Sequence, residues 1–383
     1  MASRRKRIKR QTFFDYTLLF VVIFLILFGL VMIYSTSSYE AADNFNGDSA
    51  YYLKKQLFAT VLGTFVLAAT TLIDYHVWEK FAVPGLLVSF VLVLLVMTPM
   101  GVEANGARRW IRFGPLTLQP AEVVKIEVIL FCAVLITKMN KKWIGTIKGI
   151  ATILAVPVVF ALMLWQITDN LSSAIIVGGI AVVMLFVADS DYLKYIVAVL
   201  GVLAVAGIII YVATHAEGGS FRLTRIRTWL DPESDPSNTG FQTLQALYAI
   251  GSGGIFGKGL GASMQKLGFL PEAQNDMIFS IICEELGLFG ALAVILLFVL
   301  LIWRCMVIAN NAQDLFGAML VVGVMAHFAI QVILNIAVVT NTMPNTGISL
   351  PFISYGGTSE MFLMAEIGLV LNVSRQIRLR DTM

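Results

Sequence analysis

Ten long apolar runs constrain the fold of this chain more than any other feature of its sequence. They cover approximately residues 13–34, 56–73, 81–98, 120–137, 147–165, 171–188, 193–213, 277–303, 316–339 and 357–374. A helix that crosses the hydrocarbon core of a bilayer needs about 20 mostly apolar residues. The sequence therefore predicts an all-α polytopic membrane protein with about ten transmembrane helices.

Composition excludes the soluble and disordered classes of protein. Only 13% of the 383 residues are Asp, Glu, Lys or Arg, 58% are hydrophobic, and the mean hydropathy is +0.83. A soluble domain carries about 25% charged residues, and disordered chains are polar and poor in aromatic residues. The net charge of +3 is too small to predict a nucleic-acid partner. Cys132, Cys283 and Cys305 lie in or beside apolar runs without metal-ligand spacing, so we expect buried thiols.

Basic residues between the runs predict the orientation of the chain. Six lie at 4–10, four at 138–148 and three at 375–380, and Lys80, Lys194 and Arg304 fall on the same side. Cytoplasmic loops are enriched in Lys and Arg, so we expect both termini in the cytoplasm and an even number of spans. The first run is longer than the apolar part of a cleaved signal peptide, so we expect it to be retained. The predicted units are a basic cytoplasmic segment (1–12), a ten-helix membrane domain (13–374) and a cytoplasmic tail (375–383).

A large outer loop at 214–276 separates runs seven and eight. Connections longer than about 15 residues are usually functional or disordered, and the aromatic residues of this one argue against disorder. Apolar residues at 244–250 have near-helical spacing and predict a short interfacial helix. The glycine tract at 251–261 lacks the glycine and hydroxyl positions of a phosphate-binding P-loop, so we do not expect nucleotide binding.

Six arginines are expected on the outer side, where insertion disfavours them. They are Arg108, Arg109, Arg112, Arg222, Arg225 and Arg227. Either they pair with acidic neighbours at 231, 233 and 235 or with lipid phosphates, or they form an anion site, because guanidinium forks match phosphate oxygens.

Asp276 directly precedes the eighth apolar run. It could simply cap that helix, or act as a general base at the outer mouth of a span. Glu284 and Glu285 lie two turns deeper, where we expect them to be paired, protonated or facing a polar cavity.

Two further clusters lie at the outer ends of runs. Glu122 and Lys125 are three residues apart and predict an ion pair, either structural or available to an anionic ligand. The segment 344–359 holds Pro and Gly residues, so it is predicted to be non-helical. It either lines an outward cavity with Gln331 and Asn335 or forms an ordinary outer loop. His76, His215 and His327 share no metal-ligand spacing.

Four ordered motifs together resemble the SEDS family of FtsW, RodA and SpoVE, the shape, elongation, division and sporulation glycosyltransferases of bacteria. The motifs are RRWIRFGPLTLQPAEVVK (108–125), GFQTLQALYAIGSGGIFGKGLGASMQKLGFLPEAQNDMIF (240–279), EELG (284–287) and PNTGISLPFISYGGTS (344–359). The similarity covers essentially the whole chain, including ten spans and a large loop between spans seven and eight. The stretch GASMQKLGFLPE favours the FtsW/SpoVE branch over RodA.

The resemblance implies a peptidoglycan glycosyltransferase that polymerises lipid II at the outer face of the bacterial cytoplasmic membrane, in cell division or sporulation. The family's essential aspartate falls on Asp276, its tryptophan on Trp110, and its Q-P-x-E-x-x-K motif on Gln119, Glu122 and Lys125. Two departures are visible. Asn275 and Met277 flank the aspartate where Thr and Phe are frequent, and 168–173 reads TDNLSS where many members have PDLGT, which puts any role of Asp169 in doubt.

These roles fit the residue chemistry. Asp276 would deprotonate the acceptor hydroxyl, and cationic groups would neutralise the departing pyrophosphate. The candidate substrate-binding residues are Arg108, Arg109, Trp110, Arg112, Gln119, Glu122, Lys125, Lys258, Lys266, Gln331, Asn335 and Ser354. A divalent cation, Mg²⁺ or Mn²⁺, could share the neutralisation, although the sequence contains no dedicated set of ligands for it.

Two other functions use the same residues differently. A lipid II flippase would need the arginines and the cavity but no base, and a divisome scaffold would need neither. The resemblance also implies partners: a class B penicillin-binding protein with transpeptidase activity, other divisome proteins and membrane lipid. It implies a multi-pass protein of the plasma membrane, located at the division septum.

Overall fold

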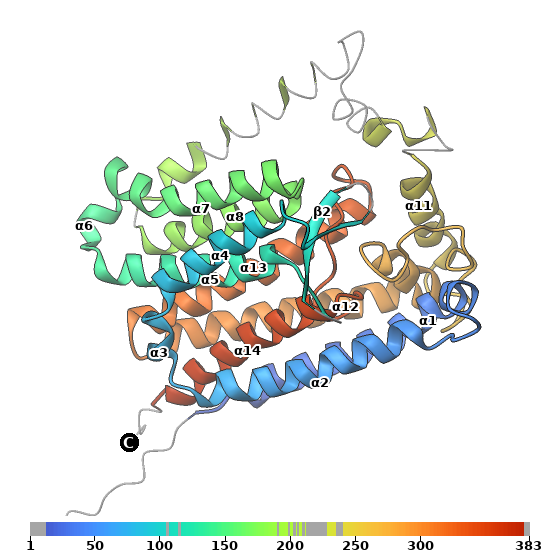
Figure 1. Cartoon of the computed structure of the whole chain (residues 1–383), viewed down its shortest axis with the longest axis horizontal. Coiled ribbons are helices and arrows are strands. Elements are labelled where there is room, and N and C mark those ends of the chain that lie inside the picture. Colours follow the sequence, from blue (N-terminus) through green and yellow to red (C-terminus); the bar gives the residue numbers. More distant parts are fainter. Residues whose placement is uncertain are drawn as a thin grey trace, which may run out of the picture.

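The computed structural model describes residues 13–104, 107–113, 116–189, 191–197, 228–234 and 240–378, with six more residues between 200 and 211. Nine long helices in these ranges lie side by side as a bundle (Figure 1). They are α1 (Tyr16–Asn44), α2 (Tyr51–Leu72), α4 (Ala82–Leu95), α5 (Pro120–Lys138), α7 (Ile147–Ile167), α8 (Leu171–Ala188), α12 (Ile278–Asn311), α13 (Leu315–Val339) and α14 (Gly357–Gln376). They correspond to nine of the ten predicted spans. The seventh predicted span, at 193–213, lies largely outside the described residues.

The outside of the bundle is apolar, as expected for a protein in a bilayer. Six of the described helices are long and apolar enough to cross a membrane. Large apolar side chains such as Phe20, Phe65 and Leu296 are exposed there, and a surface of this kind is stable only in contact with lipid or protein. Together these features describe a multi-pass membrane protein.

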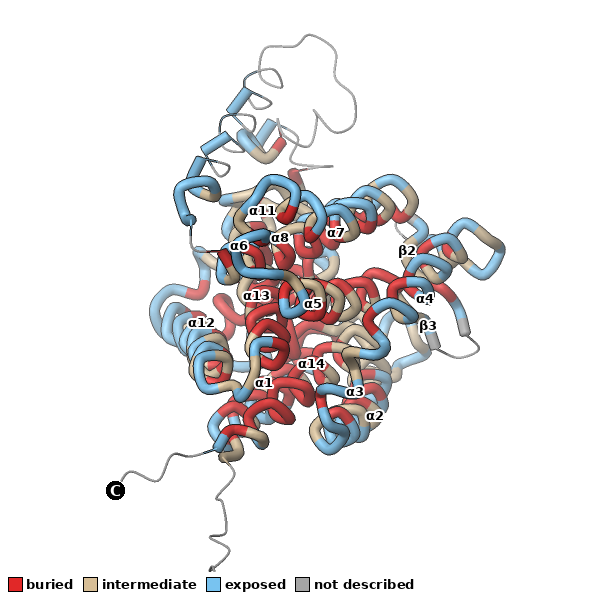
Figure 2. Tube along the Cα trace, turned by 90° about the vertical axis from the view of Figure 1, so that its left-hand side faces the viewer, coloured by how far each residue is buried: buried red, intermediate tan, exposed pale blue. Residues whose placement is uncertain are grey.

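Two of the remaining three bundle helices, α5 and α14, carry charged residues that turn inward, and α4 is a shorter apolar helix. Glu122 and Lys125 in α5 and Glu360 and Glu366 in α14 are all buried. In Figure 2, which looks along the helices, the buried residues line the inner faces, and α13 lies among α5, α8, α12 and α14. The buried charged residues of α5 and α14 therefore face the interior of the bundle.

The two ends of the described chain meet. The backbone N–H of Phe13 donates to the carbonyl of Ile377 over 3.2 Å, so the first and last described residues lie at the same end of the bundle. Short helices α3 (Tyr75–Glu79) and α6 (Lys141–Ile144) lie at this end, and α11 (Phe241–Gly253) lies at the opposite end (Figure 1). We call the end of the bundle that holds the two chain ends the termini end, and the end that holds α11 the site end. Helix α11 confirms the predicted short helix near 244–250.

The connection between α4 and α5 contains a small sheet that the sequence analysis did not predict. Strands β1 (Gly101–Ala104), β2 (Ala107–Phe113) and β3 (Leu116–Leu118) pair antiparallel in the order β1-β2-β3. The register skips one residue of β2, since Val102 pairs with Trp110 and Glu103 with Arg108. Arg109 is therefore the extra residue of a β-bulge, a feature that re-aims a side chain.

Candidate functional site

Asp276 lies in the turn that precedes α12 and does not cap that helix. The N-cap position is Met277, and it makes no side-chain cap hydrogen bond. The Asp276 side chain is 9% exposed, and its backbone carbonyl accepts a hydrogen bond of 2.8 Å from Nδ2 of Asn335. The backbone of this residue is thus fixed by α13, while capping does not explain its carboxylate.

The Asp276 carboxylate is poised to accept a proton. Its Oδ1 is buried and has no hydrogen-bond partner among the described residues. Burial and then the nearby charge of Glu272 raise the pKa of Asp276 to about 7, against the lowering effect of backbone N–H groups and of Arg109. A Cβ added to Gly347 would lie 3.8 Å from Oδ2, so the carboxylate faces the 344–356 loop. A buried carboxyl group with a near-neutral pKa suits a general base.

The bulged Arg109 is the arginine that the structure brings to this site. Its charge acts on Asp276, and its Nη2 donates to the Asp169 carbonyl over 3.0 Å. Its neighbour Arg108 instead forms an exposed ion pair with Glu103 over 3.3 Å. Arg108 is therefore an exposed residue, and its binding of substrate stays a prediction. Arg222, Arg225 and Arg227 lie outside the described residues.

The other predicted residues of this motif follow the sheet into α5. Trp110 is half-buried on β2, Arg112 is exposed, and Gln119 is the N-cap residue of α5 without a capping side chain. Pro120 occupies the first turn as expected. The predicted pair is confirmed: Lys125 Nζ lies 2.9 Å from Glu122 Oε2, with both side chains buried.

Amide side chains of α13 hold the 344–356 loop. Gln331 Nε2 donates to the Ser349 carbonyl over 3.0 Å, and Asn335 Nδ2 donates to the Ile348 carbonyl over 2.6 Å. Ser354 Oγ accepts from the Leu350 N–H over 2.7 Å. The loop is non-helical up to Gly356, as predicted. These three polar groups therefore support the loop, although Asn335 Oδ1 remains buried without a partner among the described residues.

Lys258 and Lys266, two candidate ligands of the pyrophosphate, each form an ion pair with a carboxylate of α12. Lys258 Nζ pairs with Glu284 over 2.6 Å, and Lys266 Nζ pairs with Glu285 over 2.7 Å. Each ammonium is thus compensated by a carboxylate in this structure, and their predicted role in neutralising a pyrophosphate stays a prediction. The same pairs confirm the expectation that Glu284 and Glu285 are paired.

The glycine tract packs against a kink in α12. Gly287 has φ +66° inside that helix, and a Cβ on Gly257 would lie 2.2 Å from the Glu285 carbonyl oxygen. The backbone N–H groups of Lys258 and Gly259 donate to the carbonyls of Glu284 and Glu285. The tract therefore serves a close backbone approach.

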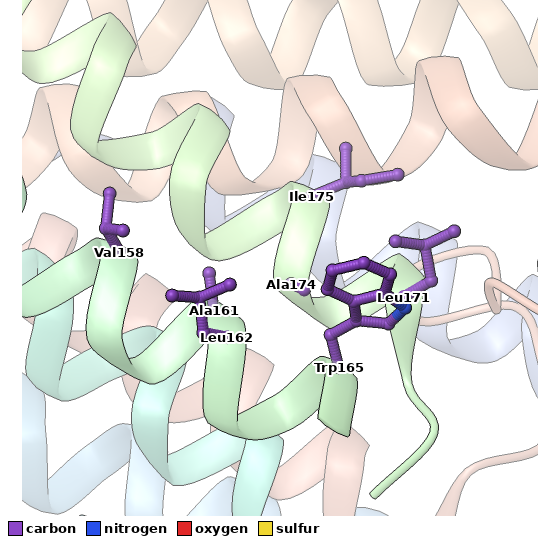
Figure 3. A pocket seen from close by; sticks show the side chains of 7 residues that line it. All are labelled: Val158, Ala161, Leu162, Trp165, Leu171, Ala174 and Ile175. Atoms are coloured by element: carbon purple, nitrogen blue, oxygen red, sulfur yellow. The ribbon is translucent and has the colours of Figure 1, made fainter. Parts of the chain in front are cut away.

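An apolar groove of about 230 Å³ lies between α7 and α8 near the site end of the bundle (Figure 3). Its lining consists of Val158, Ala161, Leu162, Trp165, Leu171, Ala174 and Ile175. Residues 168–170 connect these two helices, and Asp169 in that connection accepts the hydrogen bond from Arg109. The groove can hold a hydrocarbon chain next to a cationic side chain.

A family model described as "cell cycle protein", FtsW/RodA/SpoVE, matches residues 16–379. The chain belongs to the FtsW/RodA/SpoVE family. A probable peptidoglycan glycosyltransferase FtsW from Trichlorobacter lovleyi is 40% identical over 96% of this chain and 94% of its own length. Stage V sporulation protein E from Bacillus subtilis is 37% identical over 96% of this chain and 99% of its own length. The recognition from sequence is thus confirmed.

Solved structures of relatives share the fold. A chain from a structure of a peptidoglycan synthase complex, described as coordinating polymerization and crosslinking, superposes with a TM-score of 0.76 at 26% identity. It covers 94% of this chain and 98% of the other. The rod shape determining protein RodA of Thermus thermophilus gives a TM-score of 0.67 at 25% identity, over 96% and 98%. The all-α multi-pass architecture of the family is therefore that of this chain.

Two buried residues near the site were missed from the sequence. His327 and Glu366 contact each other inside the bundle, over 2.7 Å. The available signal was Glu366 itself, because a carboxylate within an apolar run is expected to have a polar partner. The sequence did not show that this partner is His327 on another helix.

Proposed function

We propose that this chain is a peptidoglycan glycosyltransferase that polymerises lipid II into glycan strands. The observation that supports it most is the Asp276 carboxylate. It is buried, one of its oxygens has no hydrogen-bond partner in the part of the chain that the structure describes, its pKa is near neutrality, and the charge of Arg109 acts on it. FtsW relatives named as probable peptidoglycan glycosyltransferases match the chain over almost its full length.

Asp276 is assigned the general base. The carboxylate takes the proton of the acceptor sugar hydroxyl as that oxygen bonds to the anomeric carbon of the donor, on the face opposite the leaving group. The bond from the anomeric carbon to the pyrophosphate oxygen breaks, and the lipid pyrophosphate departs with the electron pair. This is an inverting displacement, in which one base and stabilisation of the leaving group suffice.

Arg109 is assigned the principal stabiliser of the pyrophosphate. Its guanidinium matches phosphate oxygens in geometry and charge. Trp110, Arg112 and Gln119 lie on the strands and turn that carry it and complete the proposed headgroup site. Lys125 is buried in its ion pair with Glu122, so its proposed role is to set the electrostatic potential around the headgroup site. The apolar groove beside the Asp169 connection accommodates part of the isoprenoid chain.

A divalent cation at the Asp276 site would be held by substrate phosphates as well as by protein carboxylates. The described residues contain no group of three His, Cys, Asp or Glu side chains that could hold a metal ion. Mg²⁺ is commonly held by one or two carboxylates together with substrate phosphates, and the buried carboxylate of Asp276 fits that pattern. Such an ion would supply neutralising charge to the leaving group.

The proposed setting is the bacterial plasma membrane at the division septum, with the termini end cytoplasmic. Lys138, Lys142 and Arg304 belong to the termini end, as the positive-inside rule requires. A crosslinking transpeptidase of the class B penicillin-binding type is the proposed partner, supported by the solved relative from a synthase complex. Other divisome proteins and membrane lipid complete the expected partners.

Three assays on the wild type and Asp276→Ala separate the proposal from its rivals. With the crosslinking partner present, we expect the wild type to polymerise purified lipid II and the variant to fail, both in vitro and in complementing cells. Equal movement of lipid II between vesicle leaflets by both forms, without polymer, would support a flippase instead. Full complementation by Asp276→Ala would support a scaffold.

A further inference from the structure

A continuous chain of buried polar groups links three helices to the candidate site. His327 and Gln331 lie one turn apart on α13, and His327 Nε2 is 2.8 Å from Gln331 Oε1. His327 Nδ1 is 2.7 Å from Glu366 Oε2 on α14. On the other side, Lys125 Nζ of α5 is 3.4 Å from the same Gln331 oxygen. Glu366, His327, Gln331, Lys125 and Glu122 thus form one network.

Every member of this network is withdrawn from solvent. None of the five residues is more than 5% exposed, and His327 is fully buried. Burying ionisable groups is unfavourable unless they are paired, and an apolar replacement is often at least as stable. Stability alone therefore gives no reason for two glutamates, a lysine and a histidine here, whereas a positioning role does.

The directions of the hydrogen bonds show what His327 does. The Gln331 amide nitrogen donates to the Ser349 carbonyl, so its oxygen must accept from both Lys125 and His327. Nε2 of His327 must then carry a proton. Glu366 binds the opposite nitrogen and so fixes the orientation of the ring, as carboxylates beside functional histidines commonly do.

Gln331 transmits this orientation to the site. Its amide holds Ser349, and Asn335 one turn further along α13 holds the adjacent Ile348 and the carbonyl of Asp276. Turning the Gln331 amide would release Ser349 and reorient Lys125. We infer that His327 and Glu366 are positioning residues for glycosyl transfer, which act through Gln331 on the 344–356 loop that faces Asp276 and on the Lys125 ammonium. This inference rests on the proposed function.

The test is a double-mutant cycle in lipid II polymerisation, with the full chain and its crosslinking partner. We expect His327→Ala to lower kcat about tenfold or more with little change in KM, and to have no further effect in a Gln331→Leu background, because both act through one amide. Glu366→Gln, which keeps size and hydrogen-bonding groups, should fold normally and lower kcat less. Leu320→Ala on α13 removes a fully buried side chain outside the network and controls for packing.

The outcomes separate the inference from the proposed function. Absence of polymer with the wild type would count against the proposed function itself. Two outcomes with an active wild type would overturn the inference alone. In the first, His327→Ala and Glu366→Gln keep the wild-type kcat. In the second, their losses of kcat add to the loss caused by Gln331→Leu. A loss in His327→Ala matched by Leu320→Ala at equal thermal stability would also overturn it. Recovery of kcat in His327→Asn, which retains a donor, would support it.

Discussion

At the scale of single residues, the account depends on one carboxyl group whose surroundings favour its protonated form. Asp276 is buried beside Glu272, and Arg109 only partly offsets their effect on its pKa. Asp48, a carboxylate at the same end of the bundle, has a pKa lowered from its ordinary value through its hydrogen bond to Lys54. The pKa of Asp276 is raised and that of Asp48 is lowered, so we expect only Asp276 to act as a general base.

The rate of polymerisation should follow the ionisation of Asp276. A base works only when deprotonated, so kcat/KM should fall about tenfold per pH unit below a pH of about 7 and level off above it. A pH–rate profile of the purified complex between pH 5 and 9 measures this. A profile that stays flat across pH 7 would argue against Asp276 as the base.

Neighbouring arginines on β2 provide a matched pair of variants. Arg109→Met removes a charge that lowers the pKa of Asp276, so kcat/KM should drop by about one to two orders of magnitude and the midpoint of the pH profile should move upward. Arg108→Met removes only an exposed ion pair with Glu103, and such pairs contribute little. Steady-state kinetics at several pH values would check both, and equal effects of the two substitutions would contradict the assignment of Arg109.

At the scale of elements, the glycine tract and the α12 kink determine how the outer loop sits on the bundle. Gly257 has φ +77°, and its Cα faces the Glu285 carbonyl with no room for a side chain. Gly251 lies within α11 with open space around it. Two glycines six residues apart therefore have opposite requirements.

Alanine at these positions should act in opposite directions. Gly257→Ala meets both an unfavourable φ and a steric clash, so we expect it to lower the melting temperature by several degrees and reduce polymerisation. Gly251→Ala should be neutral or stabilise α11 by about 0.5–1 kcal/mol. Thermal unfolding of the purified chain measures the difference, and equal melting temperatures would show that the close packing at Gly257 is unimportant.

Elements were predictable from the sequence where the signal is local. Long apolar runs predicted nine of the described helices because lipid imposes length and composition on each span separately. The sheet at 101–118 was missed because its arginines and glycines interrupt any alternating pattern. The partners of Lys258 and Lys266 are 26 and 19 residues away in sequence, so only the kink of α12 and the folded tract reveal those pairs.

At the scale of the whole molecule, polar groups occupy the interior and both ends of the bundle, and large apolar side chains are exposed on its outside. The network from Glu366 to Lys125 could not be read from sequence, since its members come from α5, α13 and α14 and meet only in the bundle. The family motifs pointed to Asp276, which lies at the site end, but they do not tell which of the candidate cations are paired with carboxylates.

The orientation of the bundle can be tested with thiol labelling. Cys132, Cys283 and Cys305 are buried, so a membrane-impermeant reagent should give a low background. We expect Asn44→Cys at the site end to be labelled in intact cells, and Lys142→Cys at the termini end only after permeabilisation, because cytoplasmic loops carry the basic residues. The reverse pattern would place Asp276 in the cytoplasm and contradict the proposed outer-face reaction.

The most direct measurement is the rate at which purified lipid II is converted to glycan strands by the wild type, Asp276→Asn and Asp48→Asn, each with the crosslinking partner. Loss of a general base lowers a rate by about 10²–10⁴-fold, so Asp276→Asn should fall in that range. Asp48→Asn, which removes only the exposed pair with Lys54, should stay within about twofold of the wild type. A rate for Asp276→Asn as high as that of Asp48→Asn would contradict the account.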